Sequence, residues 1–164
     1  MRKEIWITSL LIFASVCMNS WAEQNTAIIT VNVTINVAPC EINNNQSIDV
    51  DFGSEVAVTD VAVGLVEKPI NYNLDCSSAD TAKSLKMVIQ GVGAEFDADV
   101  LKTTMTDLGV KIKADGSDYP LNSILNLASK DSKPVLSALL VQKPGARLET
   151  GAFNAGATMT VDYQ

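Results

Sequence analysis

Apolar and polar residues alternate along most of this 164-residue chain, and the alternation is clearest at its two ends. Every second position is apolar from Ala27 to Val37 and again from Ala157 to Tyr163. A period of two predicts a β-strand with one apolar face. The first of these strands precedes the body of the domain and needs a sheet to join. It is either the first strand of a closed domain or a strand given to another molecule's sheet.

Shorter runs between the ends predict further strands, separated by Gly, Pro, Asn and Asp. Leu121 to Leu127 is the one segment weakly compatible with a helical turn. Seven or so short strands, with few segments of helical period, predict an all-β sandwich of immunoglobulin type. The strands expected in the middle of the chain span residues 47–52, 55–63, 70–76, 85–89, 110–112 and 135–142.

The first 22 residues have the pattern of a secretory signal peptide. Arg2 and Lys3 are followed by an apolar run over residues 5–16, and small residues precede Glu23. This predicts cleavage between Ala22 and Glu23, which would also remove Cys17. An uncleaved membrane anchor is the alternative, and the absence of a long apolar span or stop-transfer pattern in the sequence disfavours it.

Charge narrows the classes of partner. Without Arg2, Lys3 and Glu4, the 12 basic residues become 10 and the 19 acidic residues become 18, so the mature chain has a net charge of −8. No basic cluster is present in the sequence. An acidic surface argues against nucleic acid and anionic membranes as partners.

The mature chain keeps two cysteines, Cys40 and Cys76. An even pair in an exported protein predicts a disulfide, which would stabilise the fold by roughly 3–4 kcal/mol. A metal site is the alternative. It is disfavoured because the sequence has no histidine and no CxxC motif.

The sequence offers little catalytic chemistry. Without histidine, a Ser-His-Asp or Cys-His nucleophile is excluded. Asp49 with Asp51, and Asp97 with Asp99, are carboxylate pairs two residues apart, but solvated aspartates are far commoner than a glycosidase pair or a calcium site. We therefore expect no enzyme activity, no cofactor, no metal and no small-molecule substrate.

Four segments resemble the chaperone–usher pilins of Gram-negative bacteria. The first runs from Ala38 through Cys40 to Gly53, and the second is Tyr72 to Cys76. The third is the strand Gly109 to Ile112. The fourth and most specific is Gly151 to Gln164, with glycine fourteenth from the end and tyrosine penultimate. The resemblance covers the whole mature chain.

The resemblance implies an incomplete immunoglobulin-like β-sandwich that lacks its last strand. It divides the chain into a signal peptide (1–22), an N-terminal donor-strand extension (23–38) and a pilin domain (39–164). The missing strand leaves an apolar groove, which a periplasmic chaperone fills first. At the outer-membrane usher, the extension of the next subunit replaces the chaperone strand, and the pilus emerges on the cell surface.

The resemblance also implies roles for particular residues. The donor face would be Ile29, Val31, Val33 and Ile35, with Ala27 and Val37 at its margins. The edge of the groove that meets the chaperone would be formed by Gly151, Met159, Val161, Tyr163 and the carboxylate of Gln164. The family usually has glycine seven residues before the first cysteine, where this chain has Val33, so its donor register is left open.

Three classes of function are weighed. A structural pilus subunit is favoured. Because the residues around Cys40 resemble those of a tip-adaptor subunit, a minor tip adaptor is the first choice and a shaft subunit the second. A two-domain tip adhesin is disfavoured because the chain is too short for a second domain. The alternative from another class is a self-contained extracellular binding module with a closed β-sandwich, and an enzyme is third.

Overall fold

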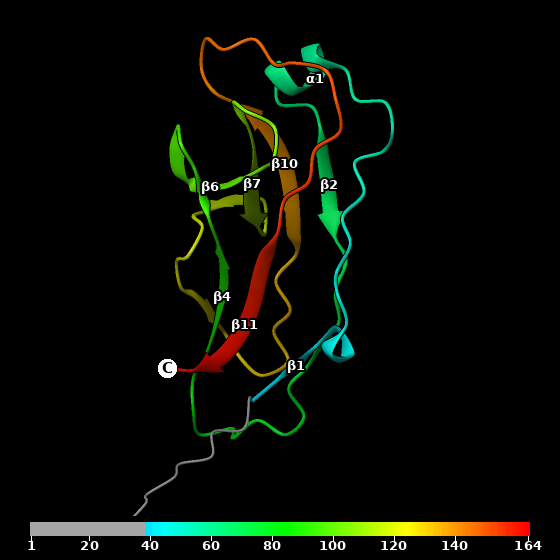
Figure 1. Cartoon of the computed structure of the whole chain (residues 1–164). Helices are drawn as coiled ribbons and strands as arrows, with labels where there is room; N and C mark the ends of the chain where they lie inside the picture. The colour runs from blue at the N-terminus through cyan, green and yellow to red at the C-terminus, as the bar shows by residue number, and fades with distance from the viewer. Residues whose placement is uncertain (1–38) are drawn as a thin grey trace, which may run out of the picture. The chain divides into compact units, whose positions relative to one another are not determined.

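The computed structural model describes residues 39–164, and nearly all of its regular elements are β-strands (Figure 1). Besides the strands it has one turn of 3₁₀ helix, η1 (Asn43–Asn45), and one short α-helix, α1 (Val58–Ala62). Among the described residues, neither helix is long and apolar enough to cross a membrane. The strands are β1 (Glu41–Ile42), β2 (Glu67–Ile70), β3 (Leu74–Asp75), β4 (Leu85–Gly91), β5 (Gly93–Ala94), β6 (Asp97–Lys102), β7 (Leu108–Ala114), β8 (Ser117–Tyr119), β9 (Leu125–Leu127), β10 (Leu136–Gln142) and β11 (Ala157–Tyr163).

The larger sheet has the strand order β2-β10-β7-β6-β5, and β8 also pairs with β7. Its pairs are antiparallel, and β10 pairs with β7 along all seven of its residues and with β2 over Leu136–Leu139. Leu136, Ala138 and Leu140 alternate with half-buried residues along β10 and are buried. This alternation fixes the register because a one-residue slip would turn the apolar face to solvent.

The smaller sheet has the order β11-β4-β9. Met87 at the centre of β4 is fully buried, and it pairs with Val161 of β11 and Leu125 of β9. Side chains from both sheets form one hydrophobic core. A third, two-stranded sheet joins β1 to β3, and the expected disulfide links Cys40 to Cys76 beside it.

The hairpin between β7 and β8 follows directly from its sequence. Asp115 and Gly116 form the two-residue turn, with φ of 49° and 80° respectively, and Ala114 pairs with Ser117 across it. Two successive positive φ angles are those of a type I′ turn, for which Asp-Gly is a preferred sequence.

Several expected elements are wrong. Residues 47–52 belong to no strand, and the valine-rich run at 55–63 contains α1. Residues 121–127 form no helical turn and end in β9. Strand β6 has no counterpart among the predicted strands, because its exposed Asp97 and Asp99 interrupt the apolar pattern before the buried Val100 and Leu101.

Candidate strand-binding groove

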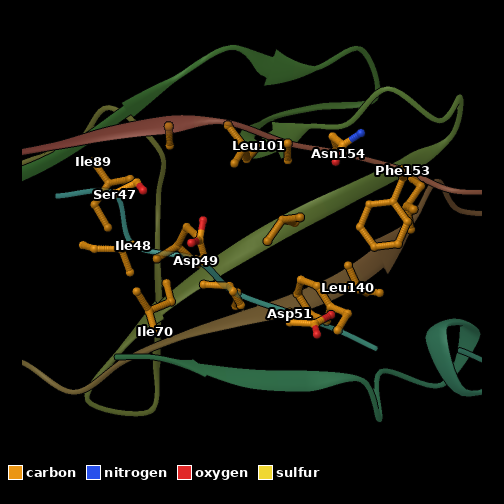
Figure 2. Close-up of a pocket in the computed structure, with 18 of the residues that line it drawn as sticks. Ser47, Ile48, Asp49, Asp51, Ile70, Ile89, Leu101, Leu140, Phe153 and Asn154 are labelled. Carbon is orange, nitrogen blue, oxygen red and sulfur yellow. The ribbon is translucent and has the colours of Figure 1, made fainter. Parts of the chain in front are cut away.

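A long apolar groove of about 1400 Å³ lies beside β11 (Figure 2). One side, here called the outer wall, is formed by residues 47–56, and the other, the β11 wall, by residues 148–162. The floor consists of apolar core residues from both sheets. It includes Ile89, Leu101, Leu108, Val110, Ile112, Ala138 and Leu140.

The β11 wall ends in a strand with one free edge. β11 pairs with β4 along all seven of its residues, and no described strand pairs with its other side. Val161 is buried and Met159 half-buried, and both line the groove. An edge strand presents unpaired N–H and C=O groups to whatever lies beside it.

The outer wall alternates in burial over residues 48–52 although it is no strand. Ile48, Val50 and Phe52 are half-buried against the core, while Asp49 and Asp51 between them are exposed. Within the described residues, segment 47–56 makes no backbone–backbone hydrogen bond. In the part of the chain that the structure describes, the groove is therefore a slot between the free edge of β11 and a segment without a backbone partner, which suits the insertion of one extended chain.

Residues 153–155 of the β11 wall contact both the segment after β6 and the outer wall, and these contacts hold one part of the groove in place. Ala155 forms an isolated antiparallel bridge with Thr103, and Thr104 N–H donates to the carbonyl oxygen of Asn154 at 2.9 Å. The rings of Phe52 and Phe153, one from each wall, lie 6.0 Å apart between centroids with a tilt of 48°. These contacts join the two walls and tie residues 154–155 to the segment after β6.

The residues expected at the groove edge fall into two groups. Gly151, Met159 and Val161 line the groove. Tyr163 and Gln164 do not, because their side chains bind elsewhere. The Tyr163 hydroxyl accepts from Asp80 N–H at 2.8 Å, and Gln164 Nε2 donates to Asn126 Oδ1 at 2.8 Å. Their contact with a chaperone stays a prediction.

The expected donor residues Ile29, Val31, Val33 and Ile35 lie outside the described residues. The structure also brings together groove residues that the sequence did not predict there. Ile48, Val50 and Phe52 were expected in an ordinary strand, and Phe153 was given no role. Their alternation was visible, but a sequence does not show whether an extended segment has a hydrogen-bonding partner.

The groove offers no described site for metal or acid–base chemistry. Within residues 39–164, no group of three or more Cys, Asp and Glu side chains is placed to hold a metal. The largest pKa shift is at Tyr72, away from the groove lining. There burial, with a smaller contribution from Asp115, raises the pKa to about 12. Its hydroxyl donates to the Pro134 carbonyl oxygen at 2.7 Å, which is a structural contact.

Comparison with known sequences gives three matches. A family model described as "Fimbrial protein" matches residues 29–164. Two proteins of Escherichia coli (strain K12), the uncharacterized fimbrial-like proteins YfcQ and YfcR, are each 29% identical to the chain. The YfcQ match covers 83% of this chain and 86% of YfcQ, and the YfcR match covers 100% and 97% respectively.

Solved structures show the same fold. The P pilus rod subunit PapA matches with a TM-score of 0.58 at 21% identity, over 84% of this chain and all of PapA. The P pilus adaptor subunit PapF matches with a TM-score of 0.58 at 22% identity, over 80% of this chain and all of PapF. A chain of a chaperone–usher pilus matches with a TM-score of 0.56 at 21% identity, over 86% of this chain and 97% of that chain. The described residues therefore have the immunoglobulin-like fold of pilus subunits.

Proposed function

The chain belongs to the fimbrial protein family, and from this premise we propose that it is a structural, non-enzymatic subunit of an adhesive pilus that assembles by donor-strand exchange. In this mechanism residues 23–38 of one subunit fill the groove of the next. The domain from residue 39 onward supplies the groove. The signal peptide directs the chain out of the cytoplasm.

One observation carries the proposal: within residues 39–164, the free edge of β11 and segment 47–56 have no backbone partner, and an apolar floor lies between them. Such a slot, left empty, is an aggregation hazard because it exposes apolar surface together with the edge of β11 and the unpaired backbone of segment 47–56. An inserted strand pairs with both edges and buries alternate side chains against the floor. The alternation at Ile29, Val31, Val33 and Ile35 fits that requirement.

The proposal includes the partners that such a slot needs. A periplasmic chaperone would cover the groove before assembly, an outer-membrane usher would exchange its strand, and neighbouring pilins would occupy the slot in the finished surface fibre. Within the fibre we place this subunit as a minor adaptor, with a shaft subunit as the next choice. The likeness around Cys40 supports this order.

Size-exclusion chromatography tests donor-strand assembly. The mature chain is purified from the periplasm with and without residues 23–38. We expect the full chain to form oligomers whose size rises with protein concentration, and the shortened chain not to form them, because only the former supplies a strand for the slot.

The opposite result is equally clear. If both proteins run as stable monomers with no other protein bound, the groove is closed in solution and donor-strand exchange is wrong. The self-contained binding module would then take its place.

A further inference from the structure

The charges along the groove all have one sign. Five acidic residues line it, and the lining contains no lysine or arginine. The outer wall contributes three of them and the β11 wall two, so carboxylates flank both sides of the apolar floor. They are Asp49, Asp51, Glu55, Glu149 and Asp162.

These carboxylates have no ion-pair partner among the described residues. The four ion pairs of the domain use Glu67, Glu95, Asp107 and Asp118, and none of these residues lines the groove. Asp162 lies opposite Lys86 in the β11–β4 pair, but no salt bridge joins them. The nearest basic residues along the chain, Lys68 and Arg147, are exposed and lie outside the lining.

The chain's own extension does not complement this charge. Residues 23–38 contain one charged residue, Glu23, and no base. If Ile29, Val31, Val33 and Ile35 face the floor, the positions between them face outward. Those positions hold Thr30, Asn32 and Thr34, which are polar but uncharged. A second copy of this chain would therefore leave the acidic walls without a counter-charge.

From these observations we propose that the groove takes the N-terminal extension of a different pilin, one with lysine or arginine at its outward positions. This inference rests on the proposed function, and it adds the kind of donor strand that the groove selects. Apolar side chains on the floor would hold any alternating strand. The acidic walls would favour a basic one, chiefly by speeding its association and in a manner that salt weakens.

Synthetic peptides with the sequence of residues 23–38 test the selection. One peptide is unchanged, one carries N32K/T34K, and one carries N32E/T34E. Association with the purified mature chain is measured by surface plasmon resonance at about 20 mM and about 500 mM salt. In low salt we expect the lysine peptide to associate roughly 3- to 10-fold faster than the unchanged peptide, and the glutamate peptide to be slowest. In high salt the three rates should converge.

Groove variants show where the selection arises. D49N/E149Q removes one carboxylate from each wall, and neither side chain makes a hydrogen bond within the described residues. We expect it to abolish most of the lysine preference. D97N/D131N removes the same charge outside the groove lining and keeps the acceptor oxygen that Asp97 offers to Asp99 N–H. This control should retain the preference.

The outcomes separate the two proposals. If no peptide binds, the proposed function itself is wrong. If all three bind at equal rates in low salt, strand insertion stands but charge selection is overturned, and a second copy is an equally good donor. If D49N/E149Q keeps the full lysine preference, the overall negative charge attracts the peptide and the groove does not select it.

Discussion

At the scale of single residues, burial decides how much each apolar side chain contributes. Leu136 and Val135 are neighbours, but Leu136 is 1% exposed and Val135 is 71% exposed. We expect Leu136→Ala to lower the free energy of unfolding by about 2–5 kcal/mol because it leaves a cavity in the core. Val135→Ala should change it by less than about 0.5 kcal/mol. Urea unfolding of the purified mature chain measures both, and equal effects would contradict the assigned core.

Two glycines form a second matched pair. An added Cβ would meet nothing within 4 Å at either Gly116 or Gly156, but only Gly116 has a left-handed φ, of +80°. We expect Gly116→Ala to destabilise by about 1–2 kcal/mol, because an L side chain is strained in that conformation. Gly156→Ala should be neutral or slightly stabilising. Thermal unfolding of both variants measures the two changes in stability. A destabilised Gly156→Ala with an unaffected Gly116→Ala would contradict the turn geometry.

At the scale of elements, the edge strand β2 is tied to its sheet by Glu67. The Ser137 hydroxyl and Lys113 Nζ both bond to its carboxylate, and they lower its pKa from the ordinary value near 4.5. A carboxylate with a lowered pKa in the folded state stabilises the fold above about pH 4.5. That contribution is lost as the pH falls and the group becomes protonated.

We therefore expect Glu67→Gln to lower the free energy of unfolding at pH 7. The effect should stay under about 1 kcal/mol because the pair is partly exposed. Its difference from the unsubstituted protein should shrink when the pH falls well below 4.5. Urea unfolding at pH 7 and pH 3.5 gives both values. Glu55→Gln, at a residue with no described ion-pair partner, is the control for removing a surface carboxylate and should change the free energy of unfolding at pH 7 by less than about 0.5 kcal/mol.

The two walls of the groove meet through Phe52 and Phe153. We expect Phe52→Ala and Phe153→Ala each to weaken binding of a peptide with the sequence of residues 23–38. The two losses should not add, with a coupling of about 0.5–1.5 kcal/mol, because each substitution removes the same aromatic pair. A double-mutant cycle of peptide affinities measures the coupling. Strictly additive losses would mean that the rings act separately.

Elements also show how far the sequence could predict the fold. The strands expected at 85–89, 110–112, 135–142 and 157–163 are confirmed as β4, β7, β10 and β11, because each packs its alternating apolar face on the core. The prediction for 47–52 is half right. Ile48, Val50 and Phe52 turn inward as alternation requires, but their segment lacks a neighbouring strand. Alternation specifies burial, whereas a strand also needs a backbone partner.

Tertiary packing explains the segments whose structure differs from the one predicted. The valine-rich run at 55–63 has a strong strand preference, but α1 buries Val61 in the core instead. This is the ordinary way in which packing overrides local propensity. The groove depends on two segments about 100 residues apart in the sequence, 47–56 and 148–162. Only a family resemblance, and no local pattern, could indicate that they would face each other.

At the scale of the whole molecule, the disulfide decides which parts of the domain bear mechanical load. It joins Cys40, at the start of the described domain, to Cys76, 36 residues later. A pull on the chain that precedes Cys40 passes directly through the two sulfur atoms and on towards β4. Residues 41–75, which include the outer wall of the groove and β2, lie in a covalently closed loop outside that path.

Single-molecule stretching of the mature chain tests this consequence. Full extension without reductant should lack the length of the closed loop, and reduction should add about 120 Å of contour length. An unchanged length on reduction would mean that no such loop exists. If fibres are joined through their N-terminal extensions, as proposed, a pull on the extension cannot extend residues 41–75, so the loop that carries the outer wall stays closed behind its disulfide while the fibre is stretched.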